Sequence, residues 1–289
     1  MSNITSSMFD SIKSALAADN NNNKSAIGDI LKTPPGNTFT VRLLPFAKDP
    51  SKTFFHYFQH GWNSFATGQY TSAISLQTFG ERDPIAEERY KILRTGNEEE
   101  KEKAKAIMRS EKWLVNVYVV NDPVNPENNG KVKMLRYGKQ IHNIITDAIE
   151  GEDASELGAR IFDLSPNGCN FRVKVEKQGD FPTYVSSKFG MPGAIDNLDE
   201  DKHKELYDNV FELSSVFNVK SADELKAMMD EHYYVRDAST DNNVVENVIV
   251  DTPIENVIVD TSVVTPVNET KKDDDEDEVL KELLEGLDV

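Results

Sequence analysis

The segment 113–138 limits the possible folds of this chain more than any other. It reads WLVNVYVV, then NDPVNPENNG, then KVKMLRYG. The first run is rich in β-branched and aromatic residues, which favour a strand, and the third run resumes strand character. The middle run supplies turn geometry through its prolines, asparagines and glycine. The segment is therefore predicted to form a β-hairpin, which excludes an all-helical fold.

Further strands are expected on both sides of this hairpin. In TFTVRLL, from Thr38, alternation places Thr40, Arg42 and Leu44 on one face of a strand. CNFRVKVEKQGDFPTYVSSKF, from Cys169, is predicted to form a second hairpin. Two more strand candidates precede the first hairpin: TFFHYFQHGW from Thr53 and QYTSAISL from Gln69.

Helices are expected between and after the strands. The charged run EEEKEKAKAIMR lies in a helical insert over about 84–109, where its Glu–Lys pairs form a solvated face. KQIHNIITDAIE, from Lys139, is predicted to be a helix, as are 203–217 and 222–233. Short strands with helical insertions and no βαβ rhythm favour a mainly β (α+β) fold, a small barrel with a helical subdomain.

The two ends of the chain differ from the middle. Residues 1–33 are predicted to be an N-terminal arm, in which Met8, Phe9, Ile12 and Leu16 recur at the spacing of a short amphipathic helix. Residues 34–236 are the expected core. Residues 237–289 are an expected disordered tail, which holds the near-repeats VENVIVDTP and IENVIVDTS, read as a linker or as two strand segments awaiting a partner. Its end, KKDDDEDEVLKELLEGLDV, would form an amphipathic helix on binding a partner.

Charge follows the same division. The chain has a net charge of -18, but residues 241–289 hold 15 Asp and Glu against 3 Lys, a net of -12. The remaining 35 acidic and 29 basic residues give a net of -6, so the acidity belongs mainly to the tail. A core of mixed charge can still gather its cations on one face.

Compartment and chemistry are also limited by the sequence. Cys169 is the one cysteine, which excludes an intrachain disulfide and a multi-cysteine metal site. The absence of an export signal and of a long apolar run leads us to expect a cytosolic protein with no membrane partner. The five histidines lie in separate elements, and no nucleotide-binding or hydrolase motif occurs, so an enzyme is disfavoured.

Cations alternate with aromatic residues along both hairpins. Such a mixture suits single-stranded nucleic acid, since cations neutralise phosphates and rings stack on bases. Trp113, ahead of an apolar run, is expected in the core, whereas Tyr137 and Tyr184 have polar and basic neighbours and are expected to stack. The basic residues of this pattern are Lys112, Lys131, Lys133, Arg136, Lys139, Arg172, Lys174 and Lys188.

NVYVVNDPVNPENNGKVKMLRYGKQI, from Asn116, resembles the single-stranded DNA-binding proteins of T-even-type tailed bacteriophages. Their hallmark is a strand, a DP…PEN-x-GKV turn, and a strand ending in R-[FY]-GK. Supporting matches are TVRLLPFAKD, HGW, GCNFRVKV and DFPTYVSSKF, in order across about residues 36–235. The acidic, leucine-bearing C-terminus is similar in kind.

The resemblance implies an OB-fold core whose cleft binds single-stranded DNA with little sequence preference. It also implies a tail that contacts phage replication, recombination and repair proteins in the cytoplasm of the infected bacterium and competes with DNA for the cleft. The alternative is a protein–protein adaptor whose OB-like core has lost its affinity for DNA.

By position, Arg136 and Tyr137 match the family's arginine–aromatic pair, and Phe181 and Tyr184 match its aromatic pair in the second hairpin. The complete nucleic-acid-binding set expected from motif and resemblance is Arg42, Arg109, Lys112, Arg136, Tyr137, Lys139, Phe181, Tyr184 and Lys188.

Two departures from the family follow. Its zinc site uses a histidine, matching His60, and three cysteines in the segment matching about 70–90, where this chain has none. We therefore expect no zinc and no other cofactor, with Ile74, Leu76, Phe79 and Ile85 packing that region instead. The family's basic N-terminal motif, which drives cooperative binding, is reduced to Lys13 and Lys24, which leaves apolar self-association through Phe9, Ile12 and Leu16 as a replacement.

Overall fold

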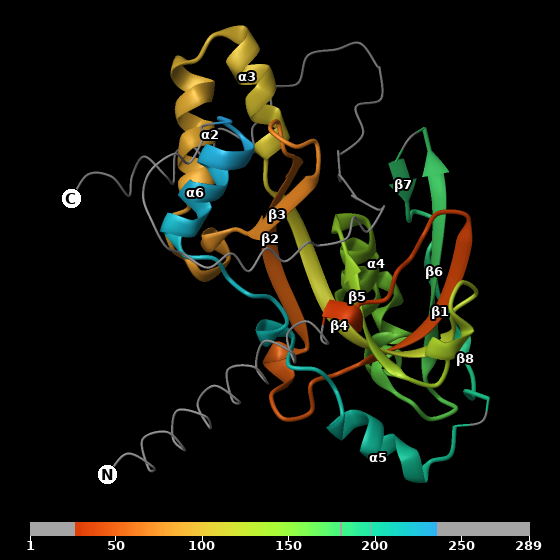
Figure 1. Ribbon diagram of the computed structural model, residues 1–289. Coiled ribbons are helices and arrows are strands. Elements are labelled where there is room, and N and C mark those ends of the chain that lie inside the picture. The colour runs from red at the N-terminus through yellow and green to blue at the C-terminus, as the bar shows by residue number, and fades with distance from the viewer. Residues whose placement is uncertain (1–26, 180, 197, 236–289) are drawn as a thin grey trace, which may run out of the picture.

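The computed structural model describes residues 27–235, apart from 180 and 197 (Figure 1). The expectations for the N-terminal helix, the repeats and the acidic tail lie outside these residues. The strands are β1 (Asn37–Leu44), β2 (Phe54–Asn63), β3 (Tyr70–Ile74), β4 (Ser110–Asn121), β5 (Val132–Tyr137), β6 (Cys169–Gln178), β7 (Phe181–Thr183) and β8 (Lys188–Pro192). The helices are α2 (Pro84–Thr95), α3 (Glu98–Ala104), α4 (Lys139–Glu150), α5 (Asp201–Asp208) and α6 (Ala222–His232).

Strand β4 organises an antiparallel sheet. Its first half pairs with β2, its second half pairs with β1 on the same side, and β5 pairs along its other side. β3 extends the sheet from β2, while β6 joins β1 and carries β7 and β8. The expected hairpins 113–138 and 169–189 are confirmed, although the second arm of the latter is divided into β7 and β8.

The sheet of the described residues is not closed, so the expected OB barrel is not shown. A connection between its open edges comes from the segment that precedes β1. Ile30 forms a parallel bridge with Met134 on β5, and the Leu31 amide donates to the Met134 carbonyl at 2.8 Å. The Gly36 amide then donates to the Val175 carbonyl on β6, also at 2.8 Å. Residues 30–36 thus run from the edge of β5 to the edge of β6.

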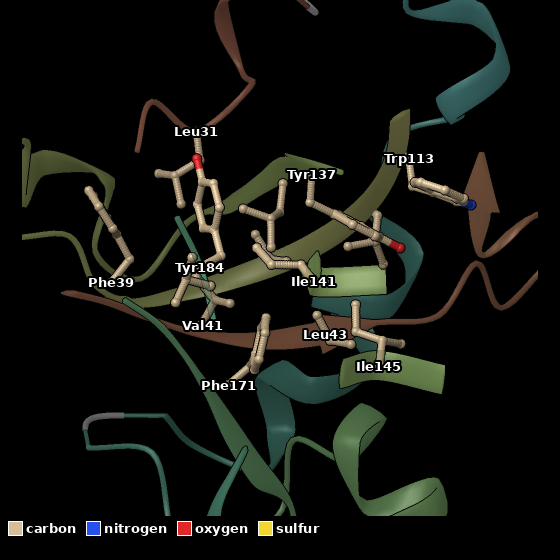
Figure 2. Packing of buried hydrophobic residues seen from close by; sticks show 14 of the residues in the cluster. Leu31, Phe39, Val41, Leu43, Trp113, Tyr137, Ile141, Ile145, Phe171 and Tyr184 are labelled. Atoms are coloured by element: carbon tan, nitrogen blue, oxygen red, sulfur yellow. The ribbon is translucent and has the colours of Figure 1, made fainter. Parts of the chain in front are cut away.

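The main core lies between this sheet and α4. Alternate β6 residues Phe171, Val173 and Val175 are buried, whereas Arg172 and Lys174 are exposed. From α4, Ile141 and Ile145 pack against the strand side chains (Figure 2). Burial of this apolar surface is the largest favourable contribution to the stability of the sheet.

A helical unit of α2, α3 and α6 packs on the β2–β3 arm (Figure 1). Each helix begins at a capping side chain: Asp83 for α2, and capping boxes at Asn97 and Ser221 for the other two. Of the side chains expected to pack this region, Ile74, Leu76 and Ile85 are buried, but Phe79 is 44% exposed. In the part of the chain described, no helix is long and apolar enough to cross a membrane.

The helical insert expected over about 84–109 is confirmed, and it contains two helices: α2 ends before Gly96, and Asn97 caps α3. One helix prediction was partly wrong. The helix expected over 203–217 stops at Asp208. The Asn116 side chain on β4 exchanges hydrogen bonds of 2.9 and 3.0 Å with the carbonyl and amide of Phe211, which engages a backbone that a helix would pair internally.

Candidate nucleic-acid interface

The register of β2, β4 and β5 divides the predicted site residues between two faces of the sheet. His56, Trp113 and Tyr137 are cross-strand partners and share one face. Lys112 and Arg136 are the sequence neighbours of Trp113 and Tyr137, so they point to the opposite face. Each of these basic residues was predicted to act together with its aromatic neighbour in the sequence, but the two lie on opposite faces of the sheet.

A series of contacting rings lies on the first face, and we call it the aromatic row: Phe58, His56, Trp113 and His142. Trp113 lies between two imidazoles, with ring centroids 4.8 Å from His56 and 4.1 Å from His142, at interplanar angles of 20° and 10°. Phe58 contacts His56 edge-on at 5.0 Å. Trp113 is buried, as expected, because the two histidines cover its faces.

Cations flank both ends of the aromatic row. The guanidinium of Arg109 lies over the Phe58 ring, 4.2 Å from its centroid. At the other end, exposed Lys139 begins α4 one turn before His142. Burial lowers the pKa of His142, and the charges of His56 and Lys139 lower it further against an opposing effect of Glu111. A neutral His142 ring stacks without adding its own charge to the site.

The outer part of the aromatic row is accessible. The His56 side chain is 45% exposed, and its Nε2 lies 2.8 Å from the Glu111 carboxylate. Phe58 and Arg109 are half-buried. The row therefore offers ring surface and positive charge at the same place, as single-strand binding requires.

The opposite face holds Lys112 and Arg136 in a more enclosed setting. Lys112 is 8% exposed. Arg136 lies beside the Tyr57 hydroxyl, whose pKa is raised to about 12 by burial despite that positive charge. Burial also raises the pKa of Tyr184, and Arg136 again acts in the opposite direction. Arg136 is half-buried at the end of β5, and its charge acts on both tyrosine hydroxyls.

Tyr137 and Tyr184 are placed in the core rather than at the surface. They are 2% and 7% exposed, and their rings lie among core side chains that include Ile141 (Figure 2). The Tyr184 amide donates to Gln140 Oε1 at 2.8 Å, which ties the end of β7 to the start of α4. Phe181, by contrast, is 45% exposed on β7.

Arg42 and Lys188 lie apart from the aromatic row. Arg42 is fully buried, and its guanidinium donates to the carbonyls of Asp163, Ser165 and Gly193 and to the Asn170 side chain. Arg42 thus connects β1 to the neighbouring loops, and we do not include Arg42 in the interface. Lys188 is exposed opposite Arg172 on the outer face of β6 and β8.

Sequence reasoning missed His56, Phe58 and His142. Alternation along β2 places His56 and Phe58 on one face, and His142 follows Lys139 by one helical turn. The strand alternation and the helical spacing can be read from the sequence. That the three side chains lie together depends on the pairing of β2 with β4 and on the packing of α4.

A family described as "gp32 DNA binding protein like" matches residues 36–232, which include the whole aromatic row and both flanking cations. The chain belongs to this family. The single-stranded DNA-binding protein of Enterobacteria phage T4 is 30% identical over 183 residues, covering 61% of this chain and 58% of that protein. The protein of the same name from Enterobacteria phage T2 is 29% identical over 201 residues, covering 66% and 64%. The chain therefore spans less than two thirds of the length of either relative.

Proposed function

We propose that this chain binds single-stranded DNA, without sequence preference, along the aromatic row. The observation that carries the proposal is the continuous contact from Arg109 through four rings to the neighbourhood of Lys139. Two relatives bear the name single-stranded DNA-binding protein, which agrees with this arrangement.

Each part of the row has a physical role in the proposal. The half-exposed rings of His56 and Phe58 receive bases, and base–aromatic stacking contributes about 1–3 kcal/mol per base. Arg109 and Lys139 neutralise phosphates, which releases counterions. Buried Trp113 holds the two imidazoles parallel. Stacking and phosphate contacts read no base identity, and duplex bases are unavailable to the rings, so the single strand is preferred.

Secondary contacts are proposed on the neighbouring strands. The end of β7 is tied to Gln140, the sequence neighbour of Lys139, and Phe181 at the start of β7 supplies a further exposed ring. Arg136 retains some exposed surface at the end of β5. Binding and coating of strands require no catalytic residue, and we propose no enzymatic activity.

The arrangement of the whole chain is part of the same proposal. Residues 34–236 act as an OB-type binding core, supported by the connection that 30–36 make between β5 and β6. The arm 1–33 serves self-association along DNA. Residues 237–289 recruit phage replication, recombination and repair proteins in the infected bacterium. A tethered segment of this charge is a local polyanion that competes with DNA for Arg109 and Lys139.

Fluorescence anisotropy tests the proposal with labelled single-stranded and duplex DNA of one length, over a range of salt. The full chain and a truncation ending at residue 236 are compared. We expect preference for the single strand, a log–log salt slope of about -0.7 per phosphate contacted, and tighter binding without the tail. Absence of binding by both forms at low salt would reject the proposal and favour the adaptor.

A further inference from the structure

A buried polar cluster connects the β2–β3 arm to the helical unit, away from the aromatic row. It consists of His60 on β2, Ser75 after β3, and Asp83, the N-cap of α2. The side chains of His60 and Asp83 are 1% and 0% exposed. Isolated charges at such depth are strongly disfavoured, so the hydrogen bonds determine what the cluster does.

The Asp83 carboxylate accepts hydrogen bonds on both oxygens. Oδ1 accepts the amides of Ile85 and Ala86, at 2.9 and 3.1 Å. Oδ2 accepts the Ser75 hydroxyl at 2.5 Å and the Leu76 amide at 2.9 Å. Burial opposes ionisation, but the hydrogen bonds and the neighbouring His60 outweigh it and hold the pKa of Asp83 well below its usual range. The carboxylate is therefore the ionised, accepting form.

Both ring nitrogens of His60 face acceptors. Nδ1 lies 2.9 Å from the Ile107 carbonyl, and Nε2 lies 3.2 Å from Asp83 Oδ2. A carbonyl and an ionised carboxylate can only accept, so each nitrogen must donate. The one form of histidine with two N–H donors is the imidazolium. The geometry is therefore that of a buried ion pair.

A zinc ion, as the resemblance would place at His60, does not fit this donor set. Zinc needs an unprotonated ring nitrogen and, in structural sites, four ligands. Both nitrogens of His60 are already engaged, and Cys169, the one cysteine, is on β6 beside Arg42. Within the described residues, no group of three or more His, Cys, Asp or Glu is placed to hold a metal.

We propose that the His60–Asp83 ion pair replaces the zinc centre of the family as a metal-independent crosslink. It joins β2, the Ser75 turn, the start of α2 and the Ile107 carbonyl ahead of β4. Apolar Leu76, Ile85 and Ile107, all buried, surround the pair and exclude water. Removing one member of such a pair leaves an uncompensated buried charge, which is strongly destabilising.

The metal is tested first, on the full chain purified from zinc-supplemented medium. Elemental analysis should find no stoichiometric zinc, and a chelator should leave the denaturant midpoint unchanged. One zinc per chain, or a midpoint that falls with the chelator, would overturn the proposal.

The ion pair is tested by a double-mutant cycle of His60→Gln and Asp83→Asn. Each single change should raise the unfolding equilibrium constant by about 100-fold or more. The double variant should be at least as stable as the less stable of the two single variants. Losses of stability that add strictly would contradict the pair. Asp49→Asn is the matched control, since Asp49 also caps a helical turn, at Ser51, but is solvent-exposed and has no histidine partner. Its effect should be much smaller.

Should the variants fail to fold, the wild-type protein still decides the question. A long-range proton–nitrogen NMR spectrum at neutral pH should show protons on both ring nitrogens of His60. A neutral ring with one bare nitrogen would overturn the ion pair.

Discussion

Arg109 lies over the ring of Phe58, with its guanidinium carbon 4.2 Å from the ring centroid. Phe58 contacts His56, and His56 stacks on Trp113, so the cation begins an uninterrupted series of rings. A base could therefore stack on Phe58 while Arg109 neutralises a neighbouring phosphate. Substitutions at each residue test the two contacts.

Arg109→Gln should weaken single-strand binding and make its salt dependence shallower. Loss of one phosphate contact reduces the magnitude of the log–log slope by about 0.7. Anisotropy titrations at several salt concentrations measure this slope. Arg94→Gln, an exposed arginine on α2, is the control and should behave as wild type. An unchanged slope for the Arg109 variant would remove it from the interface.

Phe58→Ala should lower the affinity for single-stranded DNA through loss of stacking. The expected loss is about 1–3 kcal/mol, on the order of 5- to 150-fold in Kd. Phe65→Ala removes another exposed ring, on the β2–β3 turn, and should leave affinity unchanged. Equal effects of the two substitutions would show that the aromatic row has no special role.

Arg42→Lys should act on stability and not on DNA binding. Lysine keeps the charge but cannot reach the four acceptors of the guanidinium, which are left buried and partly unsatisfied. We expect the free energy of unfolding to fall by about 2–4 kcal/mol, measured by denaturant titration. Below its unfolding transition the variant should bind DNA as wild type. Selective loss of affinity in a stable variant would instead support a phosphate contact.

The sequence predicted the central hairpin because its signals are local. The run of β-branched residues before Asp122 and the proline–asparagine turn act over a few residues each. The end of α5 was mispredicted because Asn116 binds the Phe211 backbone from 95 positions away. The residue pattern within 203–217 cannot show that contact, because Asn116 lies outside the segment.

The site was predicted in part for a similar reason. The alternating basic and aromatic residues lie in segments that form strands β4, β5 and β6, but polar flanks did not show that Tyr137 and Tyr184 turn inward. Nothing in the residues around Arg42 distinguishes it from an arginine at the surface. Ring stacking between β2, β4 and α4 depends on three elements that meet only in the fold.

Acid should destabilise the protein through His142. Because burial lowers the pKa of His142 in the folded state, the unfolded chain, with an ordinary pKa near 6.5, binds the proton more readily. The contribution of His142 to the free energy of unfolding should therefore fall as pH drops from about 7.5 through 6.5 towards 5.5. His142→Phe keeps a stacking ring and should show a weaker pH dependence in denaturant titrations. An identical dependence in the two proteins would contradict this account.

The central claim, that single-stranded DNA lies on the aromatic row, is tested most directly by tryptophan fluorescence. Trp62 is buried in the helical unit and Trp113 in the row, so Trp62→Phe leaves only the row's indole to report, and Trp113→Phe leaves only the other. On titration with oligothymidylate, we predict that Trp62→Phe retains a saturable emission change whose Kd matches anisotropy. We predict that Trp113→Phe loses this change while anisotropy still detects binding. A signal that stays with Trp62 while Trp113 is silent would contradict the account and place the DNA on the helical unit.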